Sequence, residues 1–255
     1  TKLFPPPNRT NWVVRPRLLQ KLNNGLSSGC KLVMVSAPAG SGKTTLIASW
    51  TGTLQSGPDP IKIAWLSLDT GDNDLGVFLS YVVAALRSCA PGIGEVTEHL
   101  LEQSPLPGLE SLLLPLVNDL AHLNGKVILV LDDYHLIQFS AIHEVLTFLI
   151  EYLPPNIQAV LTTRQDPLHP LDRWRGRGLL AEVRLRDLRF SGPETAQFLR
   201  QATGFDLRAE DVAALEARTE GWVAGLQLAA ISLLQSGVTP KNGSITSFVE
   251  SFTGN

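Results

Sequence analysis

Short, continuous apolar runs alternate along this chain with longer stretches in which apolar residues recur every three or four positions. Continuous runs of valine, isoleucine and leucine are typical of parallel strands that are buried on both faces. Such runs lie at 31–35, 127–131 and 157–161, an alternating strand-like segment lies at 61–66, and the helical pattern covers 15–22, 42–51, 77–88, 109–123 (kinked or restarted at Pro115) and 135–152. The alternation predicts an α/β fold with a central parallel sheet flanked by helices.

The pattern changes near residue 190. Apolar and basic residues alternate at 183–186, which predicts a last strand at the edge of the sheet. Ser191 and Glu194 form a capping box with proline in the first turn, and this box predicts a helix that runs to residue 204. Only helical patterns follow, at 210–219 and 221–234. The sequence therefore predicts two domains, one over 1–190 and a small all-α helical domain over 191–255, and 255 residues suffice for both.

Composition excludes several classes of function. A formal net charge of −3 and an isoelectric point near 5.9 offer no overall basic face for nucleic acid or for an acidic membrane. The two cysteines lie far apart without metal-ligand spacing, which fits a reducing cytoplasm, and no apolar run approaches the length of a membrane helix. The start at Thr1 without methionine and the end at Asn255 favour a piece of a longer cytoplasmic protein.

The most informative motif follows the first apolar run. The residues Ala37-Pro38-Ala39-Gly40-Ser41-Gly42-Lys43-Thr44-Thr45 have the pattern strand, glycine-rich loop, helix, and match the phosphate-binding loop of nucleoside triphosphatases. The strict pattern begins with glycine, and Ala37 stands at that position. Backbone N–H groups from Ala39 to Thr45 are expected to bind phosphate oxygens, Lys43 to reach the β and γ phosphates, and the Thr44 hydroxyl to coordinate Mg²⁺. The expected ligands are therefore ATP or ADP with Mg²⁺.

Two further strand ends carry candidate chemistry. Asp132 and Asp133 follow the run 127–131, where Asp132 is expected to bind Mg²⁺ and Asp133 to polarise a water for attack on the γ-phosphate. Arg164 follows the run 157–161. If that strand lies beside 31–35, Arg164 emerges at the phosphate end of the sheet and can stabilise charge in the transition state.

The connecting segments have plainer interpretations. Acidic residues in the turn 67–74 are expected to cap helices, and 91–107 to be a connection of low order. Seven arginines lie between 164 and 189 among four acidic residues, which favours a solvated, locally paired surface, with the alternative that one arginine reaches the nucleotide of a neighbouring subunit.

Taken together, the motifs at 36–45, 129–135, 161–164 and 221–229 resemble the MalT type of STAND ATPase, a family of large LuxR-type bacterial transcriptional activators. The resemblance covers essentially the whole chain. It implies a Walker B pair at Asp132 and Asp133, a γ-phosphate sensor at Arg164 and an adenine-contacting stretch that includes Val13 and Arg15. It also implies an inducer bound by a sensor region, DNA bound by a C-terminal region, and self-association in the ATP state. The sensor region, the DNA-binding region and a winged-helix part would lie outside this sequence. The sequence itself would contain the nucleotide-binding and helical parts.

Three functions stay open at this point. The first is a regulatory ATPase switch in which ADP holds a closed monomer, ATP and an inducer favour an open form, and slow hydrolysis resets the protein. The second is a small-molecule phosphotransferase with an arginine lid at 173–177, and the third is a module that binds nucleotide without hydrolysing it. No membrane partner is expected.

Overall fold

The computed structural model describes residues 2–7 and 12–235, which pack as two compact units. The first unit contains residues 2–6, 20–36 and 44–183, and the second contains 7, 12–19, 37–43 and 184–235. The second unit therefore takes in two short segments from the N-terminal part of the chain. The division into domains at residues 190 and 191 stays a prediction.

The first unit is built on a sheet with the strand order β2-β3-β4-β1-β5. The strands are β1 (Leu32–Ser36), β2 (Lys62–Ser67), β3 (Val127–Asp132), β4 (Ile157–Thr163) and β5 (Leu180–Arg184). The pairs β2 with β3, β3 with β4, and β4 with β1 are parallel. Strand β4 lies beside β1, as the expected position of Arg164 required, since Ser36 pairs with Thr163.

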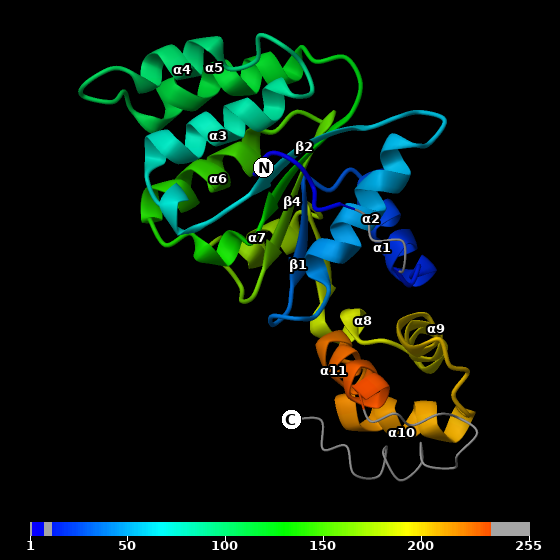
Figure 1. Ribbon diagram of the computed structural model, residues 1–255. Helices are drawn as coiled ribbons and strands as arrows, with labels where there is room; N and C mark the ends of the chain where they lie inside the picture. The colour runs from blue at the N-terminus through cyan, green and yellow to red at the C-terminus, as the bar shows by residue number, and fades with distance from the viewer. Residues whose placement is uncertain (1, 8–11, 236–255) are drawn as a thin grey trace. The chain divides into compact units, whose positions relative to one another are not determined.

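Helices cover both faces of the central strands, and β1, β3 and β4 are therefore buried at every position. Alternate strand residues such as Met34, Leu129 and Leu161 form one core with the apolar sides of the helices on that face. The first-unit helices are α1 (Pro16–Ser27, which begins in the second unit), α2 (Lys43–Gln55), α3 (Leu75–Arg87), α4 (Glu95–Leu101), α5 (Leu109–Ala121), α6 (Ser140–Tyr152) and α7 (Leu171–Gly176). In Figure 1, α3 to α6 lie on one side of the sheet, with α2 on the other. The predicted fold class is confirmed.

Some predicted boundaries were wrong. The segment 91–107 contains α4, which begins after Gly94 and packs against α5 through a bond from the Thr97 hydroxyl to the Leu112 carbonyl (3.2 Å). Helix α5 runs through Pro115 without a break. The predicted helix 135–152 divides into a 3₁₀ helix η2 (Tyr134–Leu136) and α6. Acidic caps at 67–74 are confirmed, because Asp69 caps the 3₁₀ helix η1 (Thr70–Asp72) and Asp74 caps α3.

The second unit consists of α8 (Leu185–Leu188), α9 (Gly192–Thr203), α10 (Ala209–Thr219) and α11 (Val223–Gln235) with the two N-terminal segments. The strand expected over 183–186 ends at Arg184, because the Asp187 carboxylate accepts a hydrogen bond from the Arg184 N–H (2.8 Å) and starts a helical turn. The capping box of Ser191 and Glu194 forms as predicted. Phe190, Leu199, Leu215, Leu226, Ala229, Ala230 and Leu233 make the core of this unit.

None of the described helices combines the length and the apolar composition that a membrane crossing requires.

Candidate functional site

The loop between β1 and α2 has the backbone that the sequence predicts. Gly40 and Gly42 have φ angles of +70° and +79°, in a backbone region that residues other than glycine rarely adopt. The Ser41 hydroxyl donates to the Pro38 carbonyl at 2.8 Å and holds the turn closed. Thr45 follows, exposed, in the first turn of α2. The glycines thus shape a tight loop directly before a helix N-terminus, where backbone N–H groups and the helix dipole favour an anion.

Lys43, the first residue of α2, folds back over this loop. Its side chain is only 6% exposed, and its Nζ donates to the carbonyls of Ala37 (2.8 Å) and Pro38 (3.0 Å). A buried ammonium needs such partners, since burying a cation without them is costly. The carbonyls of Ala37 and Pro38 therefore hold the lysine amine against the loop, and its role toward phosphate stays a prediction.

Asp132 lies at the centre of a buried hydroxyl cluster in the first unit. It is 3% exposed, and its Oδ1 accepts hydrogen bonds from Thr44 Oγ1 (3.0 Å) and Thr162 Oγ1 (2.5 Å). Burial raises the pKa of Asp132, and the neighbouring charge of Asp133 adds to the rise, whereas the two hydroxyl bonds oppose it. Thr162 was not among the predicted site residues, although it ends the same apolar run that leads to Arg164.

Asp133 adopts a left-handed backbone conformation, with φ +58° and ψ +38°. Its N–H donates to Thr162 Oγ1 at 2.9 Å, so one threonine fixes both aspartates. The side chain of Asp133 is 44% exposed, with its Oδ1 3.7 Å from His135 Nδ1. A non-glycine residue in this region of φ and ψ is strained, and such strain concentrates at functional sites.

Arg164 follows the end of β4, next to the end of β1 in the sheet, and its side chain is exposed. Nearby, the Ser36 hydroxyl donates to Asp166 at 3.3 Å. The sheet thus brings the ends of β1, β3 and β4 together at one edge, as parallel strands require.

A second cluster that the sequence did not reveal lies behind Asp133. The Tyr134 hydroxyl is 2.6 Å from His143 Nδ1 on α6 and 3.1 Å from His169 Nε2, and His169 Nδ1 is 2.9 Å from the Thr147 hydroxyl. Desolvation lowers the pKa of His169 to about 4, with a smaller contribution from His143, so the ring is neutral at pH 7. The cluster ties the turn after β3 to α6 and to the segment after β4.

Within the second unit, the start of α11 packs on the glycine-rich loop. The Trp222 indole Nε1 donates to the Ala39 carbonyl (3.3 Å), and the Ala224 N–H donates to the Gly40 carbonyl (3.2 Å). A Cβ on Gly40 would lie 2.7 Å from the Cβ of Ala224, so only glycine fits here. The sequence pattern at 221–229 predicted a helix but not this contact.

The two residues expected to contact adenine lie elsewhere in the second unit. Arg15 is 7% exposed, and its guanidinium donates to the carbonyls of Leu188 (2.8 Å) and Arg189 (2.9 Å) and stacks over the Phe190 ring at 4.5 Å. Val13 packs against the helical core. Both residues thus have structural contacts, and their roles toward a nucleotide stay predictions.

The residues present suit a magnesium nucleotide. Mg²⁺ prefers oxygen ligands such as the Thr44 hydroxyl and the Asp132 carboxylate, which already lie 3.0 Å apart. Phosphate oxygens need N–H donors at close range, and glycines at 40 and 42 permit that approach. We therefore expect these residues to hold the nucleotide and its metal.

This strand, loop and helix within a parallel sheet define the fold of the P-loop ATPases. The chain resembles the Walker-type ATPase of Pyrococcus abyssi with a TM-score of 0.57 at 16% identity, covering 97% of this chain and 74% of that one. It resembles a variant of RuvB from Thermotoga maritima with a TM-score of 0.52 at 16% identity, covering 96% and 72%. At this identity the likeness shows the fold alone. No protein-family model matches the chain.

The sequence itself is MalT-like. Over 235 residues, 92% of this chain, it is 35% identical to the HTH-type transcriptional regulator MalT of Yersinia pestis and 34% identical to that of Yersinia enterocolitica. The chain spans about a quarter of the length of these relatives, 25% in each case. The predicted resemblance is confirmed.

Proposed function

We propose that this chain is the ATP- and ADP-binding regulatory module of a MalT-type, LuxR-family bacterial transcriptional activator. The proposal depends above all on the buried cluster of Thr44, Asp132 and Thr162 in the first unit. The similarity to MalT supports the regulatory role. The module is a switch with slow ATP hydrolysis, and the whole protein works in the cytoplasm.

Each predicted site residue has one task in this proposal. Backbone N–H groups from Ala39 to Thr45 and the Lys43 amine bind the phosphates, while Thr44 and Asp132 hold Mg²⁺. The metal, when bound, offsets negative charge on the β and γ phosphates. Asp133 orients the attacking water, and Arg164 stabilises charge that develops on the γ-phosphate.

The contact between α11 and the loop supports a link between nucleotide and helical part. Trp222 and Ala224 occupy hydrogen-bonding positions on the same loop that would bind phosphate. A ligand that changes the conformation of the loop also changes the contacts of α11 with it. A ligand with different affinities for the two conformations then shifts the balance between them, as a switch requires. In this proposal ADP favours a closed monomer, whereas ATP and an inducer favour self-association. Inducer and DNA are bound by other parts of the protein.

The test is incubation of the protein with ATP labelled on the γ-phosphate. We expect slow release of phosphate, retained binding without release in Asp133→Asn, and unchanged release in Glu144→Gln, an exposed acidic residue on α6 that serves as the matched control. Transfer of the label to an added acceptor would instead identify a phosphotransferase. Binding without any release in the wild type would identify a binding-only module.

A further inference from the structure

A small cavity lies in the first unit, at the amino ends of its parallel strands. Its volume is about 220 Å³, and it opens between the amino ends of β1, β3 and β4 and the end of α1. The loop follows β1 at Ser36, whereas the cavity is lined by Gly29, Cys30 and Lys31, which precede β1. This volume is smaller than that of a typical drug-sized ligand site, so only a small molecule fits.

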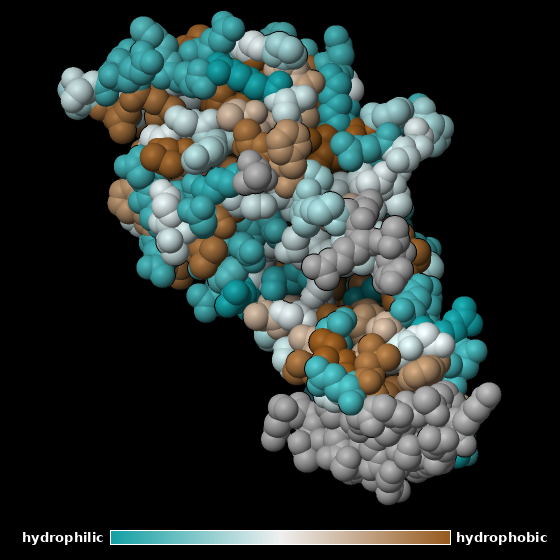
Figure 2. Space-filling view, in the orientation of Figure 1, coloured by the Kyte–Doolittle hydropathy of each residue, from teal (hydrophilic) through white to brown (hydrophobic). Residues whose placement is uncertain are grey.

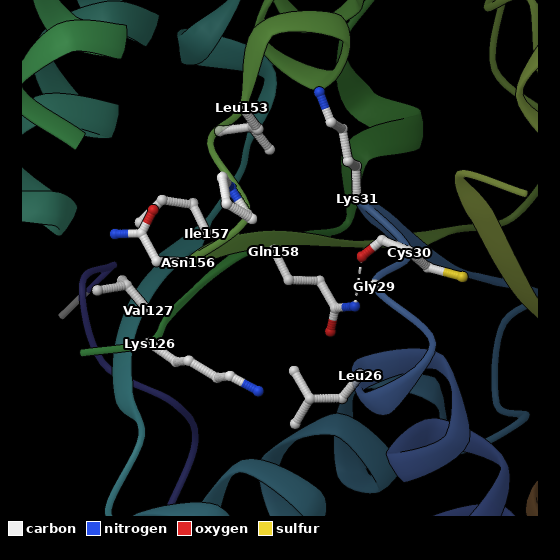
Figure 3. A pocket seen from close by; sticks show the side chains of 11 residues that line it. Leu26, Gly29, Cys30, Lys31, Lys126, Val127, Leu153, Asn156, Ile157 and Gln158 are labelled. Carbon is white, nitrogen blue, oxygen red and sulfur yellow. Dashed lines mark hydrogen bonds between the residues drawn. The ribbon is translucent and has the colours of Figure 1, made fainter. Parts of the chain in front are cut away.

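Gln158 is the buried polar side chain of this cavity. It is 4% exposed, and its Nε2 donates to the carbonyls of Cys30 (2.7 Å) and Gly25 (3.3 Å). Its Oε1 is buried and has no hydrogen-bond partner within the described part of the chain. Figure 3 shows this amide among the lining side chains, with its bond to the Cys30 carbonyl. Buried acceptors are nearly always paired, so this oxygen calls for an N–H or O–H donor.

Positive charge gathers at the same end of the sheet. Lys126 has an exposed side chain, and Figure 3 shows it extending along the cavity on the side of Leu26. The Lys31 amine donates to the Glu151 carbonyl at 2.5 Å. Burial and the charge of Arg177 lower the pKa of Lys31, whereas the charge of Glu151 raises it. An anion is favoured here over a neutral or cationic molecule.

The two features together define the ligand chemistry. The Nε2 of Gln158 has a structural role, because its hydrogen bonds join the start of β4 to the end of α1. This role does not explain why the Oε1 is buried without a partner in the described part of the chain. We propose that the cavity binds a small hydroxy acid, whose hydroxyl donates to Gln158 Oε1 and whose carboxylate pairs with Lys126. The site lies in the first unit and shares no residue with the predicted nucleotide site.

The experiment is a titration of the ¹⁵N-labelled full chain with L-lactate, followed by NMR amide shifts. We expect saturable shifts at the backbone amides of residues 29–31 and 156–158, with a dissociation constant in the millimolar range. Two matched probes separate the interactions. 2-Methoxypropanoate lacks the hydroxyl donor, lactamide lacks the negative charge, and each should bind at least about tenfold more weakly.

Variants complete the test. Lys126→Gln should weaken lactate binding about tenfold, while Lys62→Gln, an exposed lysine outside the cavity, should leave it unchanged. Because Lys126 is exposed, we expect its replacement to leave the fold intact. Absence of saturable shifts with lactate, equal binding of lactamide, or unchanged binding in Lys126→Gln would overturn the proposal and leave water as the partner of Gln158. Nucleotide binding is measured separately, so its failure does not affect this result.

Discussion

Replacing Thr162 with valine tests the buried cluster in the first unit. The change keeps the shape of the side chain but removes a hydroxyl that donates to Asp132 at 2.5 Å and accepts from the Asp133 N–H at 2.9 Å. Thr162 is fully buried, so water cannot replace either bond. A bond to a charged group contributes about 1.5 to 3 kcal/mol, and an unsatisfied buried N–H costs about 1 to 3 kcal/mol. We expect the free energy of unfolding to fall by about 3 kcal/mol.

The assay is urea unfolding followed by tryptophan fluorescence, since Trp50 and Trp65 are fully buried. Thr51→Val is the matched control. Thr51 is also buried, but its hydroxyl donates only to the carbonyls of Ile47 and Ala48 within α2. Its replacement should cost less than about 1 kcal/mol. Equal losses in the two variants would refute the reasoning that Thr162 supports the aspartate pair.

Three further predictions concern other contacts. Trp222→Ala removes the indole from the phosphate loop and should raise amide hydrogen exchange there; unchanged exchange would mean that the indole does not restrain the loop. Arg15→Met leaves the buried carboxylate of Glu194 with less positive charge and should destabilise the helical unit by about 3 kcal/mol in urea, whereas Arg200→Met on the exposed side of α9 should cost almost nothing. The pKa of His169 is lowered to about 4, so the unfolded chain binds the proton more readily. Stability should therefore be full above about pH 6.5 and fall as the pH drops toward 4, and His169→Gln should flatten this slope; parallel curves would contradict it.

The sequence predicts those parts of the site that lie close together along the chain. The glycines, Lys43 and Thr44 belong to one strand, loop and helix, whose local chemistry dictates the structure. Asp132 and Asp133 are equally visible, because a continuous apolar run ends in them. The sequence did not determine the strand order. The expected position of Arg164 required that β4 lie beside β1, and in the structure the two strands are paired.

Contacts between distant segments were not predictable in the same way. Thr162 meets Asp132 because β3 and β4 pair in a register that joins Leu131 with Leu161. A shift by one residue would turn its hydroxyl to the other face. The Tyr134 cluster needs side chains from three elements, and no local pattern encodes that meeting. The resemblance assigned Arg15 to the nucleotide, and the structure shows which carbonyls its guanidinium binds.

The proposed function requires that the Lys43 loop bind a magnesium nucleotide. Calorimetric titration of wild type and Lys43→Ala with ATP and Mg²⁺ tests it most directly, with Lys62→Ala as the surface control. Each lost charge-assisted bond is worth about 1.5 to 3 kcal/mol, so we expect measurable binding by the wild type and at least about tenfold weaker binding by Lys43→Ala. A folded wild type that binds no nucleotide, or equal affinity of wild type and Lys43→Ala, would contradict it.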